Sequence, residues 1–395
     1  MRRQSLLTAA GFAGLAIVAV CGAPPDAAAD DALAQAEVRE LIEQLGDPEF
    51  RVREEASQRL VGLKGDIGPL LADAADHPDP EVRFRVRRIL QNIAYNTRAM
   101  RLDAFLTDVG GNHGHTLPGW ERFRDIMGED SKKTRELLVS MLRADWDLLE
   151  RAEERPEDAG RELAERCEFL QQAMRVARYQ LTVGDIASIL FVATNAEVDV
   201  PQQVGSIIYS FCYQTSFRNA MNNGAQQPLL RALLGTWIVK EDSAWSAYQR
   251  LMMAMRYSMK EGLQPARRMI QAGGATPQHY RQYAILALGK LGDKSDLPLL
   301  EKPLKDKTVC ARHVRRSGKS RVTYETHISD VALAVSMHLH GEDPKKHGFS
   351  NISSNSMYLF SSNTLGFKDD SERKKVYEKW EKFLAEKRGE STEEG

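Results

Sequence analysis

Apolar residues recur along most of this chain at spacings of three and four, which predicts helices that each bury one face. In three places they form the same pattern: an apolar residue, then Arg, then apolar positions four, eight and eleven residues after the first. The three copies begin at Val52, Val82 and Tyr280, and the second starts 30 residues after the first. A helical stripe repeated at so short a period is typical of stacked helical hairpins that cover each other's apolar faces.

A turn precedes each of the first two copies, with the sequences Leu-Gly-Asp-Pro at 45–48 and His-Pro-Asp-Pro at 77–80. Asp accepts hydrogen bonds from the free N–H groups of a helix's first turn, and Pro fits the first helical position, where no N–H is needed. We expect the Arg of each copy to lie along the neighbouring helix and to bond a capping carboxylate.

These openings carry a family resemblance. The sequences Asp-Pro-Glu-Phe-Arg-Val-Arg at 47–53 and Asp-Pro-Glu-Val-Arg at 79–83 resemble the start of the second helix of a HEAT repeat, and Leu-Gly-Lys-Leu-Gly-Asp at 288–293 resembles the end of that helix and its exit turn. The resemblance covers 37–96 and 276–305. It implies an α-solenoid that scaffolds or recognises other molecules, and it implies no catalytic activity.

The sequence therefore predicts an all-α fold, an α-solenoid of HEAT-like helical hairpins with one small β-hairpin insertion near 308–327. The predicted parts are a signal peptide (1–29), N-terminal HEAT-like repeats (33–96), a loop (97–117), a central helical region (118–260), C-terminal HEAT-like repeats with the β-hairpin and a capping helix (261–388), and a frayed tail (389–395). The central region lacks the repeat pattern, so degenerate repeats and a separate module both remain open. Within it we expect Ser131 and Asp185 to cap helices.

Residues 306–327 differ from the helical segments around them. β-Branched and polar residues alternate on both sides of a Ser-Gly pair, which predicts a β-hairpin. If Ser317 and Gly318 form a two-residue turn, the numbers of paired residues sum to 635. One face of the hairpin is then partly apolar and the other is basic.

The N-terminus has the composition of a secretory leader. Two Arg residues are followed by an apolar run from Leu6 to Val20 and by a small-residue segment that ends at Ala29, which is the order found in signal peptides. The run is shorter than the ~20 residues of a spanning helix. We expect export to the periplasm or the extracellular space, with cleavage after Ala29. Lipidation at Cys21 and retention as an N-terminal membrane anchor are the alternatives.

Charge and cysteine content narrow the range of functions. The 395-residue chain has 54 Lys and Arg against 55 Asp and Glu, which argues against a nucleic-acid partner because nucleic-acid-binding proteins are usually basic. Cys167 and Cys212 lie in helical patterns, where a buried, inert thiol is expected. We also expect Trp120, Trp237 and Trp245 to fill the core rather than to line a groove.

The hairpin is the strongest binding candidate, because it gathers five cationic side chains. They are Arg312, Arg315, Arg316, Lys319 and Arg321. Arg side chains match the geometry of phosphate, sulfate and carboxylate groups, so an anionic polysaccharide, a lipid head group or an acidic partner would suit this element. The competing interpretation, which we favour, is that the tip is solvated and the cations protect exposed strand edges.

Two histidines are a weaker candidate for a metal site. His113 and His115 lie in a Gly-rich loop with Asp108 nearby, and imidazole and carboxylate groups suit zinc. Two ligands do not make a site, and no other His-rich segment accompanies them. A plain loop and no cofactor are therefore the favoured interpretation.

The chain contains no nucleophile elbow, P-loop, metalloprotease or dinucleotide-binding motif. The first hypothesis is a non-catalytic exported scaffold or binding protein that recognises a protein partner through its helical-repeat surface. The alternative is a helical-domain enzyme or metal-binding protein with its site in 97–260. A structural component of the cell envelope is a third possibility.

Overall fold

The computed structural model describes residues 25–63, 67–240, 244–317 and 320–393. The described chain is mostly helical, as predicted, with one two-stranded β-hairpin and a second, two-residue strand pair. None of the described helices combines the length and the apolar composition needed to cross a membrane. The predicted signal peptide lies outside the described residues except for its last five, which begin the first helix.

The chain divides into two compact units, Met1–Asp103 and Ala104–Gly395. The helices of the first unit are α1 (Pro25–Gln44), α2 (Phe50–Gly62), α3 (Gly68–Asp73) and α4 (Pro80–Thr107) as far as Asp103. The predicted stripes form its core. They include Ala56, Leu60, Val82 and Val86, each at most 1 % exposed.

The repeated Arg has the same hydrogen bonds in the first two copies. Arg53 Nη1 donates to the carbonyl oxygens six and five residues earlier, at 2.7 and 3.0 Å. Arg83 Nη1 does the same at 2.7 and 2.9 Å. The expected bond to a capping carboxylate is therefore wrong for these copies, because the guanidinium reaches the exposed carbonyls of the turn first. In the third copy Arg281 does pair with a carboxylate, that of Asp306.

The loop expected at 97–117 begins later than predicted. Helix α4 continues to Thr107, and the turn-rich segment starts at Asp108. Leu102 and Phe105 are 6 % and 0 % exposed, so they extend the apolar stripe by about three turns beyond Ile93. Polar residues dominate 96–101 and hide the helical period of the sequence there.

The second unit is helical apart from two short strand pairs. Its helices are α5 (Trp120–Met127), α6 (Lys132–Glu154), α7 (Pro156–Val176), α8 (Val183–Ala193), α9 (Gln202–Phe211), α10 (Thr215–Asn223), α11 (Gln227–Val239), α12 (Ala244–Tyr257), α13 (Leu263–Ala272), α14 (Gln278–Leu291), α15 (Ile328–Leu339) and α16 (Asp370–Glu393).

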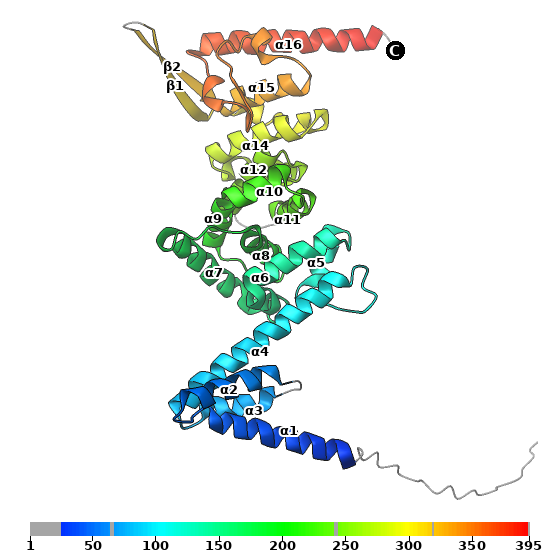
Figure 1. Cartoon of the computed structure of the whole chain (residues 1–395). Helices are drawn as coiled ribbons and strands as arrows, with labels where there is room; N and C mark the ends of the chain where they lie inside the picture. The colour runs from blue at the N-terminus through cyan, green and yellow to red at the C-terminus, as the bar shows by residue number, and fades with distance from the viewer. Residues whose placement is uncertain (1–24, 64–66, 241–243, 318–319, 394–395) are drawn as a thin grey trace, which may run out of the picture. The chain divides into compact units, whose positions relative to one another are not determined.

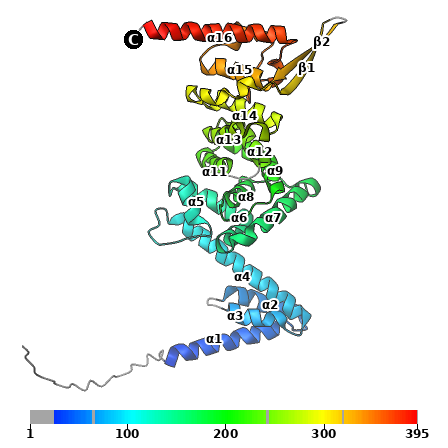
Figure 2. The same cartoon turned by 180° about the vertical axis from the view of Figure 1, so that it is seen from behind.

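These helices pack as two rows. In one row α7 contacts α9, α9 contacts α12, and α12 contacts α14; in the other α8 contacts α11, and α11 contacts α13. The pairs α7–α8, α11–α12 and α13–α14 join the rows. Figures 1 and 2 show α9 and α11 on opposite sides of this stack. The third copy of the repeat lies in α14, where Ala284 and Leu288 are fully buried.

Two predicted helix caps have different outcomes. Ser131 caps α6 as expected, since its Oγ accepts a hydrogen bond from Thr134 N at 3.2 Å. Asp185 is not the N-cap of α8. Thr182 holds that position: its Oγ1 accepts from Asp185 N at 3.1 Å, and Asp185 Oδ2 accepts from Thr182 N at 2.8 Å. The two side chains form a capping box, which places Asp185 in the first turn of the helix.

The predicted β-hairpin consists of β1 (Val309–Ser317) and β2 (Ser320–His327). Its register differs from the prediction, because the strands are joined through 318–319, which lie outside the described residues, and not through Ser317-Gly318. The numbers of paired residues therefore sum to 637 along most of the hairpin, as in Arg312 with Glu325. From Ala311 to the turn, a shift of two residues keeps the side chains on their predicted faces, one mostly half-buried and the other mostly exposed. The register is irregular between Val309 and Ala311.

The last helix, α16, lies over α15 in both views (Figures 1 and 2). Val376 and Trp380 face inward as predicted, at 5 % and 3 % exposure. The helix continues to Glu393, so the tail expected from 389 is wrong for most of its length. A single Gly389 weakens a helix without breaking it, and no proline follows.

Candidate binding surface

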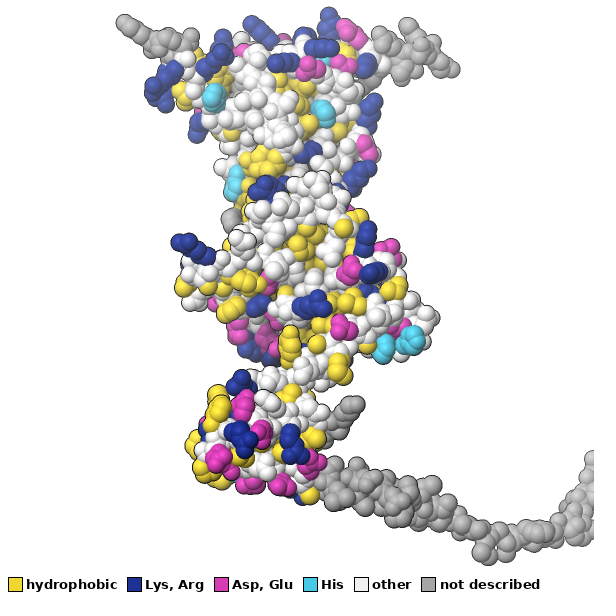
Figure 3. Space-filling model, in the orientation of Figure 1, with side chains coloured by type: hydrophobic (Ala, Val, Ile, Leu, Met, Phe, Trp, Pro, Cys, Tyr) yellow, Lys and Arg dark blue, Asp and Glu magenta, His cyan; other side chains and the backbone are white. Residues whose placement is uncertain are grey.

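Six tyrosines converge on one row of the second unit, and we call this the tyrosine surface. Its members are Tyr209, Tyr213, Tyr248, Tyr280, Tyr283 and Tyr358. Tyr209 lies in α9, Tyr248 in α12, and Tyr280 and Tyr283 in α14. Tyr213 follows α9, and Tyr358 lies in the turn between the short strands β3 (Ser354–Asn355) and β4 (Leu359–Phe360). Figure 3 shows hydrophobic side chains, a class that includes tyrosine there, gathered at the level of α14.

The rings contact one another in sequence. Tyr248 stacks on Tyr280 with ring centroids 4.4 Å apart and an interplanar angle of 19°. Tyr283 lies 5.9 Å from Tyr248 and 4.9 Å from Tyr358. Tyr280 is buried and the other three are half-buried, so each of the outer rings packs on one side and remains accessible on another.

A second pair extends the surface toward α9. The hydroxyls of Tyr209 and Tyr213 are 2.9 Å apart and hydrogen-bonded. The guanidinium of Arg256, from α12, lies 4.4 Å from the ring centroid of Tyr213, in the geometry of a cation–π interaction. Burial raises the pKa of Tyr209, and its bond with Tyr213 raises it further. The phenol therefore stays neutral and acts as a hydrogen-bonding group at physiological pH.

Helical spacing explains part of this arrangement. Tyr280 and Tyr283 are three residues apart in α14, which places them on one helix face. Tyr209 lies in the last turn of α9, and Tyr213 lies in the turn that follows the end of this helix at Phe211. Burial raises the pKa of Tyr248 to about 12, with the neighbouring tyrosines adding to it. The sequence offered the spacing in α14, but the contacts between helices depend on the packing of the row.

A rigid loop positions Tyr358. The carbonyl oxygen Oδ1 of Asn355 accepts hydrogen bonds from the N–H groups of residues 357 and 358, both at 2.9 Å. Lys290 Nζ, from α14, donates to the carbonyls of residues 356 and 357 at 2.6 and 2.9 Å. Leu359 approaches α14 at Gly289, where an added Cβ would lie 2.6 Å from the leucine side chain. The loop is thus fixed to α14 on both sides of the tyrosine.

The structure separates the five cations of the hairpin. Arg312 Nε donates to Glu325 Oε1 at 2.8 Å, so its charge is neutralised on the hairpin itself. Arg315 lies on the other face, where Nη1 is 3.4 Å from Asn351 Oδ1. Lys319 lies outside the described residues.

The last two cations of the hairpin come together. Arg316 and Arg321 are paired across the strands, and both are exposed. Like charges directly opposite each other destabilise a strand pair. Among the described residues, three of the predicted cations, Arg315, Arg316 and Arg321, therefore stay exposed without a carboxylate partner.

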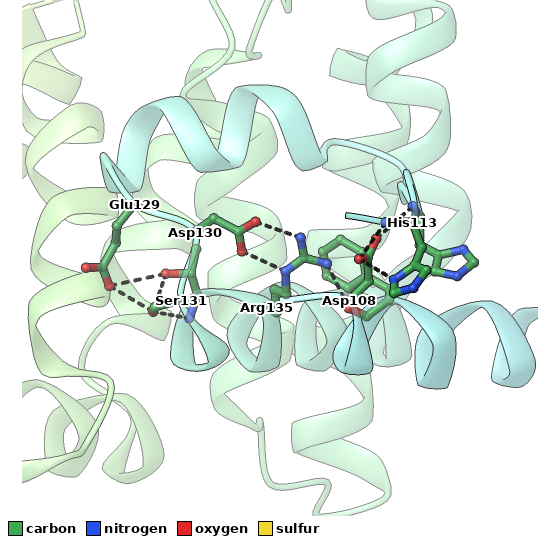
Figure 4. Close-up of polar contacts among 9 residues, drawn as sticks. Asp108, His113, Glu129, Asp130, Ser131 and Arg135 are labelled. Atoms are coloured by element: carbon green, nitrogen blue, oxygen red, sulfur yellow. Dashed lines mark hydrogen bonds and ion pairs between the residues drawn. The ribbon is translucent and has the colours of Figure 1, made fainter. Parts of the chain in front are cut away.

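The His113–His115 loop is held by Asp108 (Figure 4). Asp108 is 2 % exposed; its Oδ1 accepts from His113 N at 2.9 Å and its Oδ2 from His115 N at 3.0 Å. Burial by itself would raise the pKa of Asp108, but these hydrogen bonds outweigh it and hold the pKa at about 2. Both oxygens are thus committed to the loop, and the described residues contain no group of three side chains that would hold a metal ion.

A cavity of about 580 Å³ opens beside α6 and the start of α8, within the range of the alternative hypothesis. At its centre Arg166 is held between two carboxylates. Arg166 Nε bonds Asp145 Oδ2 at 2.8 Å, and Arg166 Nη2 lies 3.4 Å from Asp185 Oδ1. Tyr179 donates its hydroxyl proton to Asp185 Oδ2 at 3.0 Å. Helix α6 is kinked at Asp145, where burial raises the pKa of the carboxyl.

The expected core residues lie inside the second unit. Trp120 and Trp237 are each 3 % exposed, and Cys167 and Cys212 are fully buried; the side chain of Trp245 lies outside the described part of the chain. Burial raises the pKa of Cys167 to about 12. These predictions are confirmed, and neither thiol is available as a nucleophile.

The tyrosine surface is the most extensive set of partly accessible aromatic groups that these geometries bring together. Comparisons with protein-family models, with curated proteins and with solved structures found no match to this chain. The functional argument therefore depends on the chain's own geometry.

Proposed function

We propose that this chain is an exported, non-catalytic α-solenoid scaffold that recognises a protein partner through the tyrosine surface. The observation that carries the proposal is the convergence of six tyrosine rings on one row of packed helices. Tyrosine provides a large contact area and a hydrogen-bonding hydroxyl at low cost in side-chain entropy, and it is enriched at the centres of protein interfaces.

Two features support the solenoid part of the proposal. The helices contact their neighbours in two rows, and an array of stacked hairpins leaves the outer face of each row open for binding. The turns before the first two repeat copies also have the same Arg hydrogen bonds, 30 residues apart. A HEAT-like repeat would explain both features.

The partner proposed here is a segment with apolar side chains and free hydrogen-bond acceptors. The outer tyrosine rings supply apolar faces, their hydroxyls supply donors, and Arg256 supplies a cation beside Tyr213. The loop that carries Tyr358 is already fixed by Asn355 and Lys290. Binding therefore costs little ordering of the receptor.

Export is proposed from the N-terminal sequence alone. The Arg pair, the apolar run and the small-residue segment form a leader of the secretory type. A periplasmic or extracellular location places the partner in the same compartment, and a retained or lipidated N-terminus would hold the complex at a membrane.

The proposal is tested with a peptide library selected on the purified full chain. We expect the enriched peptides to lose about 2 kcal/mol of binding free energy, about 30-fold in affinity, with Tyr213→Ala or Tyr358→Ala. Tyr95→Ala is the matched control, because Tyr95 is 73 % exposed and belongs to the other unit. Proximity labelling in the native cell then supplies the natural partner for the same measurement.

Equal binding to wild type, Tyr213→Ala and Tyr358→Ala would contradict the proposal. Loss of binding with Tyr95→Ala alone would move the recognition surface to the first unit. Circular dichroism of each variant establishes that its helices are intact.

A second candidate, a helical-domain enzyme or metal-binding protein with its site in 97–260, is favoured by the cavity beside Arg166. Its volume of about 580 Å³ is within the usual range for small ligands. Elemental analysis of the purified chain, with His113→Ala and His115→Ala as variants, separates the candidates. A metal at unit stoichiometry that both variants lose would favour this second function.

A further inference from the structure

A cavity of about 400 Å³ lies at the base of the hairpin, where three segments meet. The first is the segment around Lys305 and Lys307, between the 3₁₀ turn Pro303–Lys305 and β1. The second is the junction of β2 with α15, and the third is the first two turns of α16. No sequence pattern pointed to this place, because the segments are far apart along the chain.

Positive charge dominates the lining of this cavity. It includes Lys305, Lys307, Arg373 and Lys374, and among the described residues Asp370 is the only acidic one that lines it. Lys374 also forms an exposed ion pair with Glu378 at 3.5 Å. Lys305 and Lys307 are exposed and have no ion pair within the described residues. Figure 3 shows Lys and Arg side chains concentrated over α16 and the hairpin side of the same region.

Arg373 is held in place by its own partners. Nε donates to Asp330 Oδ1 and Oδ2 at 3.0 and 3.2 Å, and Nη2 donates to the carbonyl of Glu325 at 3.0 Å. Nη1 bonds Asp370, whose carboxylate is 92 % exposed and screened by solvent. The guanidinium is therefore fixed in position and shares its charge with two carboxylates, and the exposed lysines supply the uncompensated positive charge at the mouth of the cavity.

The wall of the cavity also carries neutral hydrogen-bonding groups. The Tyr377 hydroxyl is buried without a well-formed hydrogen bond and has Ser329 as its polar neighbour. Burial lowers the pKa of His327, and Arg373 lowers it further, so the imidazole is neutral at physiological pH. A hydroxyl without a partner in a basic cavity can donate to an oxygen of an incoming anion.

The first turn of α16 adds to the positive potential. The helix begins at Asp370 and runs for 24 residues, and the N-terminus of a helix of this length carries a partial positive charge. The N–H of Glu372 in this turn already donates to Asp369 Oδ1 at 2.8 Å, so the terminus acts on the cavity through its dipole and not through that group. The lysine side chains, the Tyr377 hydroxyl and the N-terminus of α16 therefore all border the same cavity.

We propose that this cavity binds a tetrahedral oxyanion, a phosphate or sulfate group, carried by a larger molecule. Lysine and arginine supply the charge-assisted hydrogen bonds that such groups accept. The volume of about 400 Å³ corresponds to roughly thirteen water molecules at about 30 Å³ each, which exceeds the need of a bare ion. The proposal is independent of the tyrosine surface, and it places the anion at the base of the hairpin, not at the arginine tip.

The test is a calorimetric titration of the full chain with inorganic phosphate at neutral pH and low ionic strength, with inorganic sulfate as a parallel arm. We expect one saturable site with a dissociation constant of about 1 mM, the range of a few charged hydrogen bonds. Tighter binding of phosphate identifies a phosphate ester as the ligand class, and tighter binding of sulfate identifies a sulfate ester.

Four substitutions locate the site. Lys305→Gln and Lys374→Gln each weaken binding by about five- to tenfold, because each removes one charge from the cavity. Tyr377→Phe weakens it by a few fold through loss of the hydroxyl alone. Lys375→Gln is the matched control: Lys375 is the exposed neighbour on α16 but does not line the cavity, and its loss leaves the affinity unchanged.

Three results would overturn the proposal. They are the absence of saturable binding by either anion, an equal loss of affinity in Lys374→Gln and Lys375→Gln, and full affinity in both cavity lysine variants. The double variant Arg316→Gln/Arg321→Gln is the control for the hairpin tip. Loss of binding in that variant alone would place the anion there.

Discussion

Arg135 provides the sharpest test of how the second unit is held together. Its side chain is fully buried. Nε and Nη2 donate to the two oxygens of Asp130 at 2.6 and 2.7 Å, and Nη1 donates to the Phe105 carbonyl at 2.7 Å. The guanidinium also lies 4.3 Å from the ring centroid of Phe105 and 4.9 Å from that of Trp120. Figure 4 shows Arg135 directed at Asp130.

Arg135→Met keeps the length of the side chain but removes all three hydrogen bonds. The Phe105 carbonyl is then buried without a partner, which costs about 1–3 kcal/mol, and two desolvated cation–π contacts are lost at about 1 kcal/mol or more each. The Asp130 side chain is 19 % exposed. Water can hydrate its carboxylate once the guanidinium is removed, so the loss of this partner adds little to the destabilisation. We expect a loss of about 3–4 kcal/mol in the free energy of unfolding, in the range found for broken buried ion pairs.

The assay is urea unfolding followed by circular dichroism, with the transition of the second unit analysed separately because two units need not unfold together. Arg124→Met is the matched control: Arg124 pairs with Glu121 one turn away and is 43 % exposed, so we expect at most about 1 kcal/mol.

A double-mutant cycle with Asp130→Asn extends the test. The double variant should cost at least about 1.5 kcal/mol less than the sum of the single variants, because removal of both partners leaves no unpaired buried charge. The hydrogen bonds of Arg135 lower the pKa of Asp130, so the stabilisation is present above the carboxyl's unfolded pKa and is lost as the pH falls through its lower folded pKa. A loss below about 1 kcal/mol in Arg135→Met would refute the reasoning.

Two further predictions concern the repeats and the hairpin base. Arg53→Met and Arg83→Met should destabilise the first unit by similar amounts, about 1–2 kcal/mol each in urea unfolding, since each removes a charged donor from two turn carbonyls; unequal losses would contradict a shared role. Burial raises the pKa of Asp330 to about 6 against the hydrogen bonds from His327 N and Arg373. An acid with a raised pKa binds protons more tightly when folded, so stability should fall by about 3 kcal/mol as the pH rises from about 4 to about 6. Asp330→Asn should flatten this part of the urea-midpoint profile, and an unchanged profile would show that Asp330 does not cause it.

Errors in the sequence analysis came from places where several local signals competed. Helix α4 continues past 97 because Leu102 and Phe105 are buried, which local polarity concealed. The turn of the hairpin was placed one residue too early, since the Ser-Gly pair and the residues after it favour neighbouring turns equally well. The alternation of half-buried and exposed side chains along most of the hairpin was nevertheless predicted correctly, because a register shift of two residues leaves each side chain on the same face of the strand pair.

The tyrosine surface was absent from the sequence analysis for a different reason. The spacing of Tyr280 and Tyr283 was visible as a same-face helical pair. Nothing in the sequence showed that this face would meet other tyrosines, or that a distant loop would bring Tyr358 against it. These contacts depend on which helices are neighbours in the row.

The sequence by itself determined the helical class of this protein, the buried stripe of each repeat and the two-faced hairpin, because helical and strand periodicities are local properties of the chain. The tertiary structure determined which of these elements pack together and which side chains form a common surface. The tyrosine surface and the basic cavity each combine side chains from segments that are distant in sequence, and only the packing of the second unit brings them within a few ångströms of one another. The packing also paired Arg312 with Glu325 and left Arg316 and Arg321 exposed opposite each other on the hairpin.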